Sequence, residues 1–289
     1  TAGITVHNNT IRGDAGIAIK AIKGSKITKN TIGGDAANQG NTGTAIVNGS
    51  YIAENNIQKN GAIAITADAA VGETGATVVN NIIINNPGAG IVNGKIINGN
   101  RIENSNPVVA NYTGKDAIKA DPTATVTSNI ILNNAGYGIN GGKTITSNSF
   151  EIQDLNITGP TAAANYAITA TASQNAVITD NVITKPYGFG ILNGKTIQRN
   201  RITGHSNNIS GAYGIKAETG AIVTDNIITD IKGLGIENGT TIHNNTLSNL
   251  INYVKGEATS TITNNTINSS QATTVSGYAI SGGSVINFN

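Results

Sequence analysis

The sequence predicts an all-β chain that forms a single-stranded, right-handed parallel β-helix (a β-solenoid) of about 12 coils. Three observations predict this fold. A short motif built around an asparagine recurs along the chain, a second apolar motif recurs between its copies, and the apolar residues are almost all Ile, Val and Ala. Repeats that are each too short to bury their own apolar side become stable when they stack and share one core.

The first motif has an aliphatic residue, two variable residues, Asn, one variable residue, and then Ile, Leu or Phe. It reads VHNNTI at Val6–Ile11 and IAENNI at Ile52–Ile57. Successive motif asparagines lie 19 to 33 residues apart, which fits one coil for each copy. The motif asparagines are Asn9, Asn30, Asn55, Asn81, Asn100, Asn129, Asn148, Asn181, Asn200, Asn226, Asn245 and Asn265.

This spacing predicts an asparagine ladder. Each asparagine is expected at the same bend of its coil, stacked on its equivalents in the neighbouring coils. A side-chain amide in such a stack donates to one neighbour and accepts from the other, and it can also pair with buried backbone groups. The ladder is therefore the main structural site that the sequence predicts.

The second motif reads AI-x-A or GI-x-N-G, as in Ala117–Ala120 and Gly190–Gly194. Four of the asparagine intervals equal 19, and longer coils alternate with these short ones. The additional residues of the long coils are expected to protrude from one edge, and residues 1–289 are expected to form a single domain, because a solenoid grows by adding coils. The main additional segments are Ser105–Asp116, Asp154–Asn165 and Gly204–Ala212.

Composition excludes several classes of protein. Charged residues make up 12% of the chain, against about 25% in ordinary soluble domains. Without cysteine the chain has neither a disulfide framework nor a thiolate metal site. A net charge of +2 from dispersed Lys and Arg predicts no nucleic-acid partner, and no apolar run reaches the length of a membrane span. We expect no metal and no cofactor.

The two motifs together resemble the repeat of the right-handed parallel β-helix family, the pectate-lyase-like, carbohydrate-binding and sugar-hydrolase class. The resemblance extends from Ile4 to about Ile280. This class includes pectate-lyase-like enzymes, mannuronan epimerases, phage tailspikes and bacterial surface proteins. The resemblance implies the fold, and it implies that a catalytic member would carry clustered carboxylates, basic residues or calcium on one sheet face.

The carboxylates do not predict such a cluster. Glycoside hydrolysis needs two carboxylates roughly 5 to 9.5 Å apart. Asp68, Asp121 and Glu218 follow the second motif on alternate coils, which would separate them by about 10 Å or more. Asp180 and Asp225 are likewise two coils apart. We therefore predict no catalytic residue and interpret these residues as solvated turn residues.

The basic residues are also dispersed. Arg101 and Arg201 occupy the same motif position four coils apart, and the three histidines do not cluster. A sparse basic row, which could contact an anionic polymer but more simply keeps the surface soluble, consists of Lys95, Lys143 and Lys195.

A row of aromatic residues precedes the second motif. Tyr137, Tyr166, Phe189 and Tyr213 each stand two residues before the motif isoleucine, on four consecutive coils. Residues i and i+2 of a strand face the same side, so we expect these rings to stack inside the core with the isoleucines. An external row that stacks on sugar rings is the alternative.

These observations favour a non-catalytic extracellular or cell-surface structural protein, such as a surface fibre, an adhesin or a self-assembling filament subunit. We expect self-association, head to tail or lateral. Two alternatives stay open. One is a polysaccharide-acting enzyme or tailspike-like module (lyase, epimerase or hydrolase). The other is a carbohydrate-binding module that uses the loops Ser105–Asp116 and Asp154–Asn165, so that polysaccharide is a possible partner.

Overall fold

The computed structural model describes residues 3–13, 16–34, 41–69, 75–104, 116–134, 136–151, 166–172, 174–186, 189–204, 212–268 and 279–287. All regular elements in these ranges are β-strands. No helix in the described ranges is long and apolar enough to cross a membrane. Internal contacts divide the chain into two compact units, residues 1–144 and residues 145–289, and each is described by itself.

Unit 1 contains coils of three short strands. The first coil consists of β1 (Thr5–His7), β2 (Thr10–Ile11) and β3 (Ile19–Lys20). The order then repeats with β4 (Lys26–Thr28), β5 (Thr31–Gly33), β6 (Ile46–Val47), β7 (Tyr51–Ala53), β8 (Asn56–Gln58), β9 (Ile65–Thr66), β10 (Thr77–Val79), β11 (Ile82–Ile84), β12 (Ile91–Val92), β13 (Ile96–Asn98), β14 (Arg101–Glu103), β15 (Ile118–Lys119), β16 (Thr125–Thr127), β17 (Ile130–Leu132) and β18 (Ile139–Asn140).

Unit 2 repeats the same pattern after β19 (Thr144–Thr146), which contains the boundary between the units. Its strands are β20 (Ser149–Glu151), β21 (Tyr166–Thr169), β22 (Val177–Thr179), β23 (Val182–Thr184), β24 (Phe189–Leu192), β25 (Thr196–Gln198), β26 (Arg201–Thr203), β27 (Ala212–Lys216), β28 (Ile222–Thr224), β29 (Ile227–Thr229), β30 (Gly233–Glu237), β31 (Thr241–His243), β32 (Thr246–Ser248), β33 (Asn252–Lys255), β34 (Thr261–Thr263), β35 (Thr266–Asn268), β36 (Ile280–Ser281) and β37 (Val285–Asn287).

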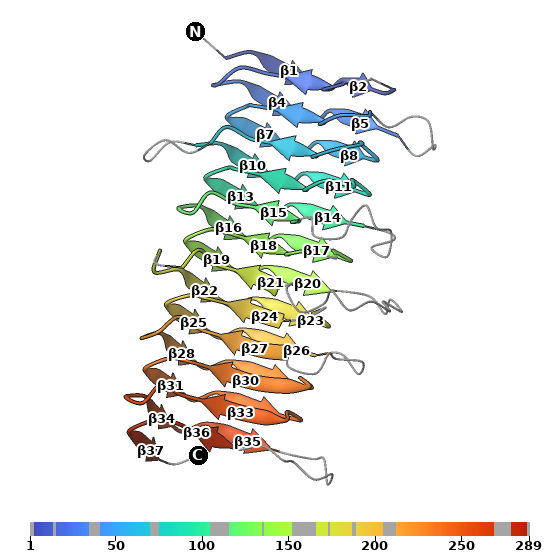
Figure 1. The fold of residues 1–289 in the computed structure, drawn as a ribbon. Coiled ribbons are helices and arrows are strands. Elements are labelled where there is room, and N and C mark those ends of the chain that lie inside the picture. The colour runs from blue at the N-terminus through green and yellow to red at the C-terminus, as the bar shows by residue number, and fades with distance from the viewer. Residues whose placement is uncertain are drawn as a thin grey trace. The chain divides into compact units, whose positions relative to one another are not determined.

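Within each unit, every strand pairs in parallel with the strand three places further along the chain, which produces three parallel sheets (Figure 1). We call them sheet A (β1, β4, β7 and so on), sheet B (β2, β5, β8) and sheet C (β3, β6, β9). The first motif forms sheets A and B, and the second motif forms sheet C. The predicted β-solenoid with parallel stacked coils is thus confirmed, whereas the single domain over residues 1–289 stays a prediction.

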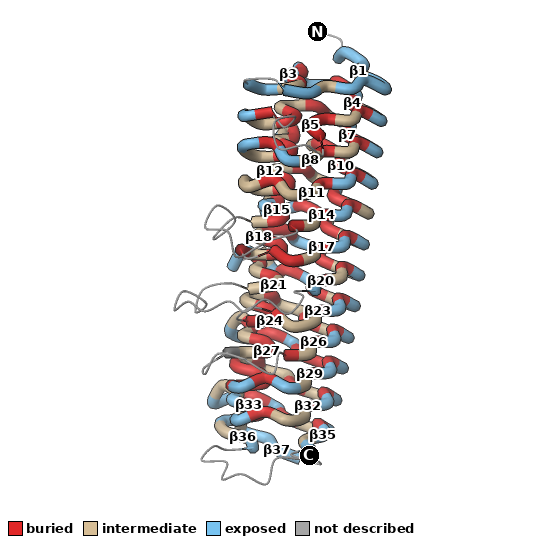
Figure 2. The backbone as a smooth tube through the Cα atoms, turned by 90° about the vertical axis from the view of Figure 1, so that its right-hand side faces the viewer, coloured by how far each residue is buried: buried red, intermediate tan, exposed pale blue. Residues whose placement is uncertain are grey.

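The core consists mainly of the middle residues of the strands of sheets A and B and the motif isoleucine of sheet C (Figure 2). In sheet A the register stacks Val6 on Ile27 and Ile27 on Ile52. Ile27, Ile52 and Ile197 have no exposed surface. Adjacent strands of a sheet lie about 4.8 Å apart, so in-register β-branched side chains pack directly on their equivalents. The prevalence of Ile and Val follows from this thin, layered core.

A single residue in the left-handed conformation makes the bend between sheets A and B. It immediately precedes the ladder asparagine in every motif copy of the described ranges, with φ between 53° and 65°. A left-handed residue other than glycine costs roughly 1–2 kcal/mol, so something must hold it there. The residues are Asn8, Lys29, Glu54, Asn80, Gly99, Ser128, Ser147, Asp180, Arg199, Asp225, Asn244 and Asn264.

Candidate functional site

The ladder asparagine holds this bend through a repeated set of hydrogen bonds. The Nδ2 of Asn55 donates to the carbonyl of Ala53, two residues earlier, at 3.0 Å, which closes the turn around the left-handed residue. It also donates to the carbonyl of Ile27 in the preceding coil at 2.9 Å and to Oδ1 of Asn81 in the following coil at 2.9 Å. One side chain thereby satisfies backbone and side-chain groups of three coils.

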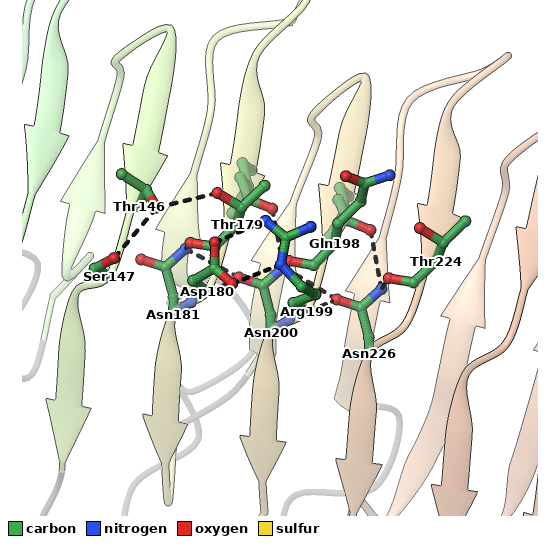
Figure 3. A network of polar contacts seen from close by, with 12 residues as sticks. Thr146, Ser147, Thr179, Asp180, Asn181, Gln198, Arg199, Asn200, Thr224 and Asn226 are labelled. Carbon is green, nitrogen blue, oxygen red and sulfur yellow. Dashed lines mark hydrogen bonds and ion pairs between the residues drawn. The ribbon is translucent and has the colours of Figure 1, made fainter.

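The backbone N–H of each ladder asparagine also donates to Oδ1 of the next one, at 2.9 to 3.1 Å. These bonds run from Asn9 to Asn129 in unit 1 and from Asn148 to Asn265 in unit 2. Figure 3 shows Asn181, Asn200 and Asn226 following one another across adjacent coils. The ladder predicted from the sequence is confirmed.

Asparagine is chemically suited to this position. The amide oxygen accepts two bonds from one neighbouring coil, and the amide nitrogen supplies the donors for the turn and for the other coil. Aspartate would lack the donor, and a stack of buried carboxylates would repel. From Asn30 onward the ladder members are at most 2% exposed, so an unpaired group here would be costly.

Unit 1 contains a second, shorter asparagine ladder that the sequence analysis missed. Asn41 donates through Nδ2 to Oδ1 of Asn60 at 2.8 Å, and the backbone N–H of Asn60 donates to Oδ1 of Asn86 at 2.9 Å. Asn104 and Asn134 make an equivalent contact at 3.3 Å. The signal was present: most of these asparagines lie four or five residues after a ladder asparagine.

Unit 2 fills the corresponding positions with buried apolar residues, Pro186, Ile231 and Leu250. The second ladder is therefore replaceable by apolar packing, whereas the first ladder is present in every coil of the described ranges.

The carboxylates that follow the second motif cap turns of the preceding coil. Asp68 accepts from the N–H of Gly49 at 3.2 Å and from Oγ of Ser50 at 2.7 Å. Glu218 accepts from the N–H of Gly194 at 3.4 Å. These bonds pair backbone N–H groups of the Asn-Gly turns at Gly49 and Gly194.

Glu257 has the same role as Asp68 and Glu218, whereas Asp121 does not. Glu257 accepts from the N–H groups of Gly220 and Gly239, at 2.8 and 3.0 Å. Asp121 instead folds onto its own turn, where it accepts from the N–H and Oγ1 of Thr123 at 2.9 and 2.7 Å.

Asp180 lies beside Arg199 of the next coil, and the guanidinium makes a bidentate contact with the carboxylate at 2.7 and 2.9 Å (Figure 3). The hydrogen bond from Arg199 lowers the pKa of Asp180. Both side chains are about half exposed, so water screens the pair and its contribution to stability is small. Asp225 lies one coil further and accepts from Nδ2 of Asn244.

Glu237 is the most enclosed carboxylate of unit 2 whose contacts the structure describes. Its side chain is 10% exposed and lies between Lys216 and Lys255 of the two neighbouring coils, at 3.0 and 2.9 Å. Burial raises the pKa of the Glu237 carboxyl, but the ammonium groups of Lys255 and Lys216 outweigh burial, so its pKa lies below the ordinary value. Glu237 therefore carries a negative charge that bridges three coils of sheet C.

The aromatic row stacks, with ring centroids 4.5 Å apart for Tyr166 and Phe189 and 5.5 Å apart for Phe189 and Tyr213. Tyr137 belongs to unit 1 and is half-buried, and Nδ2 of Asn134 donates to its carbonyl at 2.9 Å.

The expectation that these rings face the core is wrong for Tyr213. A Cβ on the next residue, Gly214, would lie 2.6 Å from a methyl group of buried Ile228, so Gly214 faces inward, and so does fully buried Ile215. Two consecutive inward residues break the alternation, which turns Tyr213 outward. The ammonium group of Lys216 accordingly lies 5.0 Å from the centroid of the Tyr213 ring.

This stack also bears on the alternative of sugar binding. A pyranose ring stacks on an open aromatic face, but the faces of Phe189 are turned toward the rings of Tyr166 and Tyr213. The contacts thus use the aromatic surface to join coils of sheet C, at about 0.5–1.5 kcal/mol for each pair.

The dispersed basic residues likewise contact the next coil or their own strand. Nζ of Lys95 donates to Oγ1 of Thr123 at 2.8 Å, and Nζ of Lys195 donates to the carbonyl of Thr219 at 3.0 Å. Arg101 contacts Glu103 at 2.6 Å. The segments 105–115, 152–165 and 205–211, expected to protrude, lie outside the described residues.

Comparisons with family models, curated proteins and solved structures find no match to this chain. Within the described ranges, no three His, Asp or Glu residues are grouped so that they could hold a metal ion.

We predict that Asn100→Leu destabilises the protein strongly, because it removes the acceptor for the N–H of Asn81, one of the acceptors for Nδ2 of Asn81, and the side-chain donor to the carbonyl of Val78. Each unpaired buried group costs about 1–3 kcal/mol. The control is Asn98→Leu on the same strand, whose side chain is half-buried outside the ladder. Equal losses of unfolding free energy in urea for the two variants would contradict the role of the ladder.

We also predict that Glu237→Gln changes the pH dependence of stability. Because the folded-state pKa of Glu237 is lowered, its carboxylate stabilises the protein above the ordinary glutamate pKa of about 4.3, and this stabilisation is lost as the pH falls through the folded-state pKa. Denaturant unfolding at neutral and acidic pH should show a smaller acid-induced loss for Glu237→Gln. The control is Glu54→Gln, which removes an exposed pair with Lys29 and should retain the wild-type acid sensitivity.

Proposed function

We propose that this chain is a non-catalytic structural β-solenoid, extracellular or on a cell surface, which serves as a fibre, adhesin or filament subunit. One observation carries the proposal: four of the described carboxylates are engaged in contacts that join coils. Asp68, Glu218 and Glu257 cap backbone N–H groups of other coils, and Glu237 is held between two lysines.

The outer sheet faces support self-association as part of this role. Parallel sheets are normally covered on both faces, yet large aliphatic residues on the outer faces of sheets A and B are about two-fifths exposed in both units. Within each unit these residues are separated along the sheets by Thr or Arg, as Ile82 and Ile130 are by Arg101. Partly exposed apolar side chains that recur on an outer face favour contact with another chain. These residues are Ile82, Ile96, Ile130, Val177, Val182, Ile222 and Ile227.

The non-catalytic part of the proposal predicts no turnover of a broad panel of uronate-containing and neutral polysaccharides. Assays would detect unsaturated products, new reducing ends and changed uronate epimers. Turnover of any panel member that a single substitution such as Asp180→Asn abolishes would favour the polysaccharide-acting alternative instead.

The association part predicts concentration-dependent lateral assembly, observable by sedimentation and electron microscopy. Ile96→Thr with Ile222→Thr should reduce it, because threonine keeps the β-branched shape but removes apolar surface. The matched control is Thr125→Ser with Thr196→Ser, at the adjacent positions of the same rows. Wild-type protein that stays monomeric at high concentration, or assembly unaffected by the isoleucine substitutions, would contradict lateral association through these faces.

A further inference from the structure

Two Asn-Gly turns of the chain form a natural matched pair. Gly90–Lys95 reads GIVNGK and Gly190–Lys195 reads GILNGK. Both asparagines are left-handed, with φ of 67° and 65°, and both following glycines have φ of 104°. In both turns the asparagine is half-buried and the glycine buried. The local sequences differ only in Val92 and Leu192, and backbone and burial match, so a large difference in reactivity must come from neighbouring coils.

The turn at Asn193 is held on both sides of its Asn-Gly bond. Nδ2 of Asn193 donates to the carbonyl of Ala170 in the preceding coil at 3.0 Å. The N–H of Gly194 donates to Oε1 of Glu218 in the following coil at 3.4 Å. The turns at Asn48 and Asn238 are held in the same way, by Asp68 and Glu257.

At Asn93 the hydrogen bond from the asparagine side chain is weak, and the hydrogen bond from the following glycine N–H is missing from the described ranges. Nδ2 of Asn93 is 3.5 Å from the carbonyl of Ala67, at the limit of a hydrogen bond. In the next coil, the acidic residue that follows the second motif is Asp121. Its side chain is one methylene shorter than that of Glu218, and its carboxylate accepts hydrogen bonds from Thr123. Within the described ranges no hydrogen bond involves the N–H of Gly94.

We propose that Asn93 is a selective site of deamidation. The backbone nitrogen of Gly94 attacks Cγ of Asn93 and loses its proton, while the side-chain amide leaves as ammonia and a succinimide forms. Water then opens the ring at either carbonyl, which produces aspartate or isoaspartate. The reaction needs rotation of the peptide plane and a free Gly94 nitrogen. A 3.0 Å hydrogen bond on Asn193 and a longer, 3.4 Å hydrogen bond on Gly194 oppose both requirements. At Asn93 the first bond is 3.5 Å long, and the second is absent within the described ranges.

The modification has a structural consequence at the same turn. The new carboxylate cannot donate to the carbonyl of Ala67, and its charge repels that oxygen. Deamidation therefore loosens the contact between this turn and the preceding coil. Among the matched turns, the turn around Asn93 is the first to lose this contact over time.

The test incubates the folded chain in mildly alkaline buffer and follows both turns by proteolytic digestion and mass spectrometry, with chromatographic separation of the Asn, Asp and isoaspartate peptides. Asn93 should deamidate at least about fivefold faster than Asn193, the factor that one net hydrogen bond contributes. In the denatured chain the two rates should be similar, because the flanking residues match except for Val92 and Leu192.

Two variants separate the proposed cause from general flexibility. Glu218→Ala should raise the rate at Asn193 and leave the rate at Asn93 unchanged, whereas Glu151→Ala, the same charge change on an exposed residue of unit 2, should alter neither. Equal rates in the folded chain, a faster reaction at Asn193, or no effect of Glu218→Ala would overturn the proposal.

Discussion

The left-handed bend before each ladder asparagine is the constraint on which the rest of the structure depends. Each bend turns the chain from sheet A to sheet B within one residue, and residues as unsuited to that conformation as Lys29, Glu54 and Arg199 adopt it. The cost recurs in every coil, so the compensation must recur too. Asparagine provides it, because its amide closes the bend and at the same time bonds to the coils on either side. The motif therefore tolerates almost any residue at the bend but only asparagine after it.

The alternation of short and long coils has a related physical basis. A short coil turns through Asn-Gly, which exposes a glycine N–H, and a long coil supplies an acidic residue that accepts from it, as Glu218 does for Gly194. The asparagine of the turn donates back to the coil before it. Two coil types with complementary turns are thus interleaved. Asp121, which bonds to Thr123 instead of Gly94, shows that this complementarity can fail locally without loss of the fold.

Features that repeat along the sequence could be predicted from it, whereas contacts that depend on the strand register could not. The fold and the ladder follow from a motif that repeats at coil length. Tyr213 was placed on the wrong side because strict alternation holds only while successive side chains change sides, and at Gly214 and Ile215 both face inward. Glu237 pairs with Lys255 and Lys216, which lie 18 and 21 positions away from it in the sequence. Only the strand register brings these lysines next to Glu237. The second ladder was not predicted because its asparagines follow the bend at several different distances.

Because nearly every polar contact described here joins a coil to its immediate neighbours, the stability of each unit is close to a sum of coil-to-coil terms. A fold of this kind tolerates change on its outer faces, where Ile96 and Thr125 occupy the same row, but not at the bend, where a lost amide leaves groups of three coils unpaired. The ladder therefore maintains the scaffold, and the outer rows are the part of the described surface that is free to vary. In this chain those rows carry Thr and aliphatic side chains with a few charged ones such as Arg101 and Arg201, which supports the proposal that they contact other chains.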